Sequence, residues 1–362
     1  MLSVLAFLLF APLEARNLEV MIGKSAETEI TFLENYAIVI NNNHYYGPIS
    51  KDIPLKVDNF DDYSVRLQLK YKENGKEKYR SLGYTSAPIL IVREFKNKVD
   101  FEKTVPPEKL KSKKISISDI NLYKEVKKKT PFFRYKNDSF SGWMEFAGPL
   151  SILVRKQSKD KFYLVETTNL EDYLVHVTNC EMRVASNKEA YKAQSILSRT
   201  FVFNKVMERL YSNNPNKDNW LDFQLLPDER DQAYICEMRV KNNTPPSKAV
   251  KEAVKETENQ LLFDKQGQLM KVHYCAYCGD CTYCKEANHC RTENGLGCCQ
   301  NGIAYYTNKK GYDHKQVLKQ YYPDSVIISY KDKAKTALNN ILDKREFDDN
   351  LSEIERRLKQ MI

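Results

Sequence analysis

NLEDYLVHVTNCEMRVASNKEAYKAQSILSRTFVF, residues 169–203, contains the central feature of this chain, a carboxylate at the end of an apolar helical stripe. The stripe has the spacing i, i+3, i+4, i+7 of a helix that faces a core, through Leu170, Tyr173, Leu174 and Val177. Glu181 follows Val177 by four residues and so shares this face. If Glu181 is partly buried, we expect it to hold its proton more tightly than a free glutamate, which makes it a candidate general acid. The alternative is that the helix ends near Cys180 and Glu181 points into water.

Length and patterning predict an α+β protein with two folded regions. The chain has 362 residues, enough for a sizeable core. Residues 1–15, MLSVLAFLLFAPLEA, predict a secretory signal cleaved near Ala15, although no Lys or Arg precedes the apolar run. We therefore expect an exported protein of the periplasm or cell envelope.

Residues 16–130 predict a strand-rich N-terminal region that ends in a Lys-rich linker. Apolar residues alternate with polar ones from Val65 to Lys72, and Asn74–Gly75 supplies a hairpin turn. The segment 106–130 is rich in lysine and predicts a linker or a solvated helix. The net charge of +9 suits an anionic partner such as a cell-wall polymer or a lipid surface. The lysines lack the interleaved aromatic residues of a nucleic-acid platform, so we exclude nucleic acid as a partner.

Residues 131–328 predict a mixed α+β region, and residues 329–362 a charged helical tail that is either an accessory helix or a loosely docked terminus. The predicted strands are 140–146, 150–154 and 162–167, and the predicted helices are 170–182, 188–207, 245–257 and 313–322. Strands 260–263 and 268–274 are expected to form a hairpin. Ser186 or Asn187 can cap the second helix.

The pentapeptide CEMRV occurs twice, at 180–184 and at 236–240. The second copy alternates as a strand does, which places Glu237 opposite its mostly apolar face. The first copy ends a helix with Glu181 on the apolar side. We interpret the repeat as coincidence and favour Glu181 as the functional carboxylate.

Seven of the nine cysteines lie between residues 275 and 299. Cys275, Cys278, Cys281 and Cys284 follow one another at intervals of three, with His273 and His289 nearby. This spacing suits tetrahedral zinc, and it suits equally two or three disulfides in an exported protein. Iron–sulfur ligation fits less well because the ferredoxin pattern ends in Cys-Pro, which is absent. A redox protein built on this cluster is a distant rival function, and a visible absorption spectrum would test it.

Several motifs, in order along residues 140–328, resemble the stage II sporulation protein D (SpoIID/LytB) family. The first is an LEDYL helix with a Glu-Met pair and an A-x-K-A-Q…R-T helix, all within residues 170–200. Further matches are Asp231–Tyr234, Ala253–Leu262, Tyr274 with Gly279 and Thr282, Gly295 to Gly302, and Tyr321–Pro323. The resemblance implies a mixed α+β SpoIID-like domain with a Cys-rich loop.

The resemblance also implies a peptidoglycan lytic transglycosylase that cuts denuded glycan strands between N-acetylmuramic acid and N-acetylglucosamine, in septal or sporulation-like remodelling. The family's catalytic glutamate falls on Glu181 and its active-site arginine on Arg199, with Gln194 a neighbouring candidate. Tyr274 and Gln300 are expected to bind the sugar. The alternative is a non-catalytic glycan-binding activator of a cell-wall amidase, with the amidase as partner.

This chain departs from the family pattern at four motif positions: Arg183 replaces proline, Cys275 replaces histidine, Asp280 replaces the second glycine of the loop and Asn294 replaces histidine. Metal-bearing members of the family bind zinc near this loop. Here the resemblance implies a structural zinc on Cys275, Cys278, Cys281 and Cys284, with no open coordination position.

Overall fold

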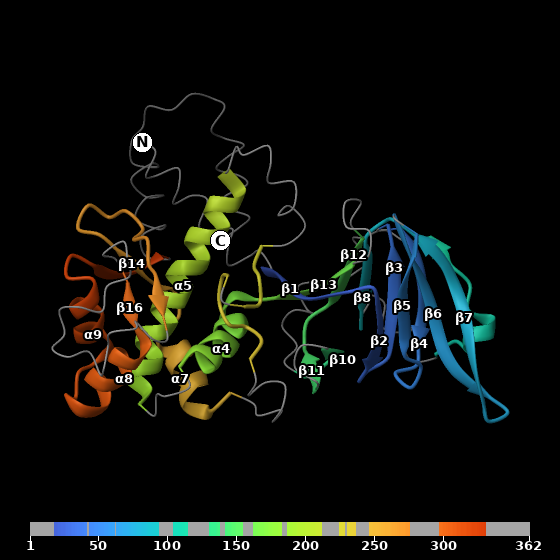
Figure 1. The fold of residues 1–362 in the computed structure, drawn as a ribbon, viewed down its shortest axis with the longest axis horizontal. Coiled ribbons are helices and arrows are strands. Elements are labelled where there is room, and N and C mark those ends of the chain that lie inside the picture. The colour runs from blue at the N-terminus through green and yellow to red at the C-terminus, as the bar shows by residue number, and fades with distance from the viewer. Residues whose placement is uncertain are drawn as a thin grey trace, which may run out of the picture.

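The computed structural model describes residues 18–41, 43–61, 63–93, 104–114, 130–137, 142–154, 162–182, 187–211, 224–228, 230–236, 246–275 and 297–330. Within these residues, strands gather in one half of the molecule and helices in the other (Figure 1). The predicted α+β class is confirmed. The expected signal segment 1–15, most of the tail and most of the Cys-rich loop lie outside the described residues.

Two sheets that pack over a common core form the strand-rich half. The larger has the order β1-β13-β12-β8-β3-β4-β9 and the smaller has the order β11-β10-β2-β5-β6-β7. Their strands are β1 (Leu18–Ser25), β2 (Glu27–Phe32), β3 (Tyr36–Ile40), β4 (His44–Ile49), β5 (Leu55–Asp61), β6 (Ser64–Glu73), β7 (Lys76–Thr85), β8 (Ile89–Val92), β9 (Lys113–Lys114), β10 (Phe133–Asn137), β11 (Gly142–Phe146), β12 (Leu150–Val154) and β13 (Phe162–Thr168). Ile38 and Ile152 from the larger sheet share one buried cluster with Val57 and Leu67 from the smaller.

The hairpin of β6 and β7 follows the predicted alternation. Val65, Leu67 and Leu69 are buried at 1% exposure or less, while the residues between them reach solvent. Asn74 and Gly75 have φ of 51° and 77°, in the left-handed region that a two-residue hairpin turn requires. The predicted turn is therefore confirmed.

Pairing between distant strands ties the N-terminal region to the middle of the chain. β1 pairs antiparallel with β13 from Leu18↔Thr168 to Ser25↔Phe162, and β10 pairs with β2. Each sheet thus combines strands from both sides of residue 130, and the expected domain boundary there does not coincide with a break in either sheet. The division into 16–130 and 131–328 remains a prediction.

The helical half contains α4 (Leu170–Glu181), α5 (Lys188–Tyr211), α7 (Lys248–Glu256), α8 (Gln300–Lys309) and α9 (His314–Tyr321). The predicted helices are confirmed, with ends shifted by a few residues. Asn169 caps α4, and the Asn187 side chain accepts the N–H of Glu189 at 2.8 Å. None of the helices in the described ranges is long and apolar enough to cross a membrane.

The hairpin predicted for 260–263 and 268–274 is only partly present. β14 (Gln260–Phe263) contacts the second segment through one isolated bridge, Phe263 to Leu269, and pairs along its length with β17 (Val326–Ser329). The predicted pairing of 260–263 with 268–274 was wrong because β14 is buried on both faces. Its residues Leu261, Leu262 and Phe263 are all fully buried. A strand of this kind needs a partner along its whole backbone, and the distant β17 supplies it.

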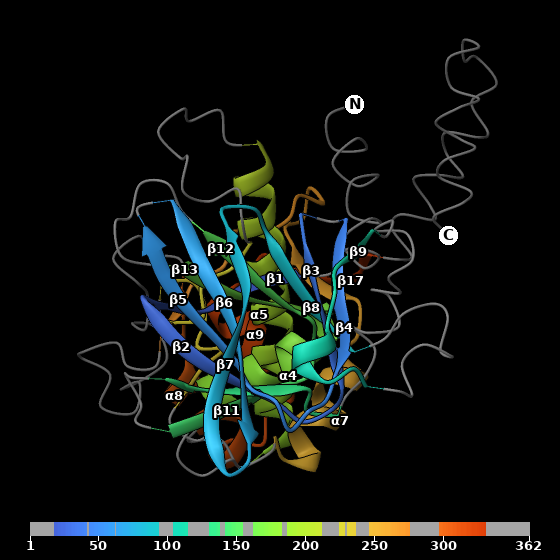
Figure 2. The ribbon, with the colours of Figure 1, turned by 90° about the vertical axis from the view of Figure 1, so that its right-hand side faces the viewer.

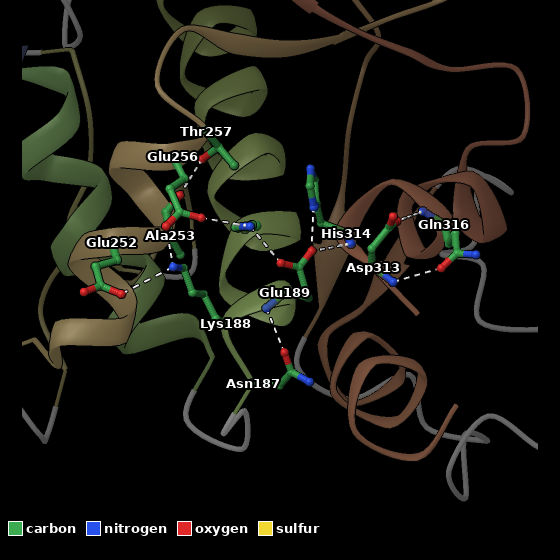
Figure 3. A network of polar contacts seen from close by, with 11 residues as sticks. Asn187, Lys188, Glu189, Glu252, Ala253, Glu256, Thr257, Asp313, His314 and Gln316 are labelled. Atoms are coloured by element: carbon green, nitrogen blue, oxygen red, sulfur yellow. Dashed lines mark hydrogen bonds and ion pairs between the residues drawn. The ribbon is translucent and has the colours of Figure 1, made fainter. Parts of the chain in front are cut away.

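Ion pairs fasten α5 to its neighbours α7 and α9 (Figure 3). Lys192 lies 2.7 Å from Glu189 and 2.9 Å from Glu256, and Lys188 also pairs with Glu256. Glu189 reaches α9, where its Oε2 accepts the N–H of His314 at 3.0 Å and lies 2.7 Å from the Nδ1 of the same residue. Burial alone would raise the pKa of Glu189, but Lys192 and His314 outweigh it and lower that pKa to about 2.

Candidate active site

Glu181 is the last residue of α4 and is held by two hydrogen-bond donors from distant parts of the chain. Its Oε1 accepts the main-chain N–H of Ala233 at 2.7 Å, and its Oε2 accepts from Nε2 of Gln300 at 2.8 Å. The side chain is partly exposed. The carboxylate is thus fixed in direction while it remains within reach of solvent, so the predicted placement beside the apolar stripe is confirmed.

The packing of the apolar stripe explains the position of Glu181. Leu170, Tyr173, Leu174 and Val177 are at most 4% exposed and belong to the same buried cluster as the sandwich core. Because α4 packs on this core along its length, its last residue lies at the edge of the contact. There one side of the carboxylate meets protein and the other meets water.

A disulfide between Cys180 and Cys236 lies beside this carboxylate. Cys180 directly precedes Glu181, and Cys236 follows the donor Ala233 by three residues. The bond therefore joins the end of α4 to the segment that supplies the donor. These two cysteines open the two CEMRV copies, so the repeat that we interpreted as coincidence contained a signal for a covalent link.

Gln232, which precedes the donor residue Ala233, is the centre of a buried polar network. Its Nε2 donates to the carbonyl of Ser198 at 3.1 Å and to the hydroxyl of Tyr274 at 2.7 Å, and its Oε1 accepts from the hydroxyl of Tyr173 at 3.0 Å. All three polar functions of the amide are thus engaged. Sequence reasoning did not single out Gln232, although it lies in the Asp-Gln-x-Tyr segment.

Tyr274 and Gln194 join the same network through Ser198. The hydroxyls of Tyr274 and Ser198 are 3.4 Å apart, and Nε2 of Gln194 donates to the Ser198 hydroxyl at 3.0 Å. Burial, reinforced by the negative charge of Glu181, raises the pKa of Tyr274 well above its ordinary value. The phenol therefore stays protonated near neutral pH, and its hydrogen bonds hold the framework behind the carboxylate.

Two amide oxygens near this framework have no hydrogen-bond partner among the described residues. They are the buried Oε1 atoms of Gln194 and Gln300. Such acceptors are uncommon inside proteins, because each forgoes a hydrogen bond that water would provide. Gln300 begins α8, which the side chain of Cys299 caps by accepting the N–H of Gly302.

Arg199 lies apart from Glu181 in its contacts. Its Nε and Nη2 donate to the two carboxylate oxygens of Glu171 at 2.9 and 2.7 Å. Its remaining N–H groups face the carbonyls of Ser195, Val254 and Gln260 at 3.2 to 3.5 Å. The residue is fully buried, with all five donors directed at protein groups. Glu171 stands at the opposite end of α4 from Glu181, so the structure does not bring together the arginine and the glutamate that we expected in one site.

Only one of the four expected zinc ligands, Cys275, falls within the described residues. It lies on β15 (Tyr274–Cys275), which pairs parallel with β16 (Cys298–Cys299), and its Sγ is 3.9 Å from the carbonyl oxygen of Cys298. Cys278, Cys281 and Cys284 lie outside the described residues. The ranges that the structure describes contain no group of three or more metal-ligating side chains, and the zinc remains a prediction.

The comparison with known families matches the part of the chain that contains Glu181. Residues 158–263 match the model of the SpoIID family, described as stage II sporulation protein. The matched range contains α4, α5, α7 and β14, and with them Glu181, Gln194, Arg199 and the donor Ala233. No match was found among curated proteins. Residues 158–263 therefore form a SpoIID domain, which relates the protein to sporulation and to the cell wall.

Proposed function

We propose that this protein is a lytic transglycosylase that cleaves peptide-free peptidoglycan strands. The observation that carries the proposal is the placement of Glu181, partly exposed and oriented by the Ala233 N–H and the Gln300 amide. A catalytic acid needs a fixed direction and access to the bond it protonates. Glu181 has both.

A lytic transglycosylase needs one carboxylate rather than two. Glycosidases that use water employ a pair of carboxyl groups. In the proposed reaction Glu181 gives its proton to the bridging glycosidic oxygen as the C1–O bond breaks. The C6 hydroxyl of the same muramic acid then attacks C1 and returns its proton to Glu181, which closes a 1,6-anhydro ring. Because the nucleophile belongs to the substrate, a high effective concentration replaces a positioned water molecule.

Asp231 is a second carboxylate near the site, but its surroundings do not suit this role. Its negative charge acts on Tyr274, so it lies near the same framework. However, its side chain is 1% exposed and its Oδ2 accepts the N–H of Leu226 at 2.7 Å. A carboxylate so enclosed stabilises a turn and does not reach a sugar.

The other site residues receive supporting roles in the proposal. Tyr274 holds Gln232, and Gln232 precedes the residue whose N–H orients Glu181, so both are positioning residues. The unpartnered amide oxygens of Gln194 and Gln300 offer acceptors that a small shift would expose to sugar hydroxyls. Arg199 takes no part, because its donors are already occupied.

We propose further that the protein works outside the cytoplasm. The disulfide between Cys180 and Cys236 supports this location, because such bonds persist in oxidising compartments. A structural zinc on the Cys-rich loop and a cell-wall amidase as partner belong to the same proposal. Metal analysis of the purified protein tests the zinc.

The decisive experiment compares wild type with Glu181→Gln on purified peptide-free glycan strands, with mass spectrometry of the products. We expect anhydro-muramoyl ends from wild type and a loss of at least about 100-fold in the variant, the usual contribution of a general acid. Glu208→Gln, the same chemical change at an exposed position of α5, is the matched control and should retain activity. If wild type binds the strands and leaves them intact, the amidase-activator alternative replaces the enzyme.

A further inference from the structure

Exposed aromatic side chains gather on one face of the smaller sheet. The described residues include six large hydrophobic side chains that are more than 40% exposed: Phe60, Tyr63, Tyr79, Tyr84, Trp143 and Val326. The first five are all aromatic, and they lie on β5, β7 and β11 or in the turn between β5 and β6. Large apolar side chains gathered on an exposed face of a protein can mark an interaction site.

The sheet register places these rings on a single face. Tyr84 pairs with Arg66 and Tyr79 pairs with Lys70, while Trp143 pairs with Lys136. Leu67, next to Arg66 on β6, and Met144, next to Trp143 on β11, point the other way into the core. Figure 2 shows this sheet turned toward the viewer, on the side of the molecule away from the helices. We name this surface the aromatic face, consisting of Phe60, Tyr63, Tyr79, Tyr84 and Trp143.

Neighbouring side chains hold several of these rings in place. The rings of Phe60 and Tyr84 are 3.9 Å apart at their centroids. The guanidinium of Arg134 lies 4.9 Å from the ring centroid of Trp143, and Nζ of Lys56 lies 5.9 Å from that of Tyr79. Rings that are already ordered lose little conformational entropy when a ligand stacks on them.

Three of the basic side chains between the rings are paired with acidic neighbours. Lys56 lies 2.7 Å from Glu27, and Lys70 lies 3.3 Å from Glu29. Arg66 donates to both oxygens of Asp58, at 2.9 and 2.6 Å. A polyanion such as nucleic acid or an acidic membrane draws its affinity from cations that are available to it, and here these three are committed. The centre of a protein interface is depleted of charged residues, whereas this face has them between its rings.

A sugar polymer matches this combination of rings and paired charges. Each pyranose presents apolar C–H groups on its faces, which pack on aromatic rings, and hydroxyl groups at its edge, which hydrogen-bond to charged side chains. The paired charges of the face complement a ligand that is mainly uncharged and rich in hydroxyl groups.

We propose that the aromatic face is a second glycan-binding site, which holds a peptidoglycan strand on the strand-rich half of the molecule. The proposal rests on the proposed function for the identity of the glycan and deepens it. A strand held there raises the effective concentration of the same polymer at Glu181 without any new contact at the carboxylate. The aromatic face therefore affects the cleavage of long strands and not that of short ones.

The test is co-sedimentation of the full chain with insoluble peptide-free glycan strands, carried out with the triple variant Tyr79→Ala/Tyr84→Ala/Trp143→Ala. We expect its dissociation constant to rise at least tenfold, because each stacked ring supplies an appreciable share of the binding. Val326→Ala, at the exposed hydrophobic residue outside the aromatic face, is the control and should bind as wild type does. The single variant Trp143→Ala is the control for folding. Its thermal unfolding midpoint should equal that of wild type, so that weaker sedimentation does not come from a folding defect.

Two further arms separate this proposal from the proposed function. Glu181→Gln should sediment with the strands as wild type does, and the triple variant should cleave soluble tetrasaccharides at the wild-type rate. If wild type cleaves no substrate but the triple variant still loses sedimentation, the enzyme assignment fails and the aromatic face stands. If the triple variant sediments as well as wild type, or binds less only to single-stranded DNA or anionic vesicles, the proposed glycan site is wrong.

Discussion

Breaking the disulfide between Cys180 and Cys236 should reduce both stability and activity. The two cysteines are 56 residues apart in the sequence, so the bond closes a long loop in the unfolded chain. The loop-entropy relation gives about 4 kcal/mol of stabilisation for a loop of this length, as an upper value. Both cysteines are at most 4% exposed, so truncating them also removes some packing.

A double-mutant cycle isolates the bond from the packing. The variants are Cys180→Ala, Cys236→Ala and the double variant, measured by urea unfolding followed with far-ultraviolet circular dichroism. Because either single substitution already removes the bond, each should cost nearly as much as both together, with a coupling of about 3 kcal/mol or more between the sites. Single effects that simply add up to the double effect would falsify the disulfide and the reasoning built on it.

The same variants should affect catalysis through Glu181. Ala233, whose N–H holds the carboxylate, lies three residues from Cys236, so loss of the bond releases both the end of α4 and the donor segment. A displacement of about 1 Å at a catalytic group can cost about 100-fold in rate. We expect kcat on glycan strands to fall more than tenfold under conditions where the variants remain folded. An unchanged kcat would show that α4 and the segment hold their positions without the bond.

Three further perturbations test the framework around the site. Arg199→Met should destabilise the protein by at most about 3 kcal/mol in urea unfolding, because it leaves the partly buried carboxylate of Glu171 without its ion-pair partner. Glu189 has a folded pKa of about 2 against an ordinary 4.5, so the stability it contributes through Lys192 and His314 is present above pH 4.5 and is lost as pH falls through 2. Glu189→Gln should therefore be less stable than wild type by at most about 3 kcal/mol at pH 7, with the gap closing near pH 2, as followed by unfolding across that range. Gly148→Ala should lower the melting temperature by several degrees in a thermal scan, because its Cβ would lie 1.9 Å from a backbone carbonyl oxygen of β13.

Local pattern was sufficient to predict four of the helices, α4, α5, α7 and α9, whereas α8 was not predicted. The stripe on α4 and the alternation along β6 predicted which side chains are buried, because helix and strand periods act over a few residues. The Asn74–Gly75 turn was predictable for the same reason, since its chemistry lies in two adjacent residues. Local pattern did not predict which strands pair with each other. The pairing of β1 with β13 joins residues more than 100 positions apart, and β14 takes β17 rather than its neighbour in sequence.

The site was predictable where a side chain carries its own signal. Glu181 stood out as a carboxylate on an apolar stripe, and the resemblance to a family supplied Gln300. The N–H of Ala233 could not be found in this way, because every residue except proline has one. For Arg199 the resemblance implied a role in the active site, but the structure pairs this residue with Glu171 instead. That bidentate contact depends on how α4 packs against α5, which local sequence does not reveal.

The position of Glu181 depends on the strand-rich half as much as on the helices. The Tyr234 hydroxyl donates to Glu166 of β13 at 2.7 Å, and the N–H of Leu225 donates to the carbonyl of Glu19 on β1 at 3.2 Å. The segments that lead to Ala233 are therefore fastened to the sheet, while α4 packs on the core beneath it. A fragment that begins at residue 169 would lose both of these hydrogen bonds and the core on which α4 packs. The apolar stripe of α4 would then be exposed. We expect it to be insoluble or to lack cooperative thermal unfolding, and a folded, active fragment would show that the strands are dispensable to the site.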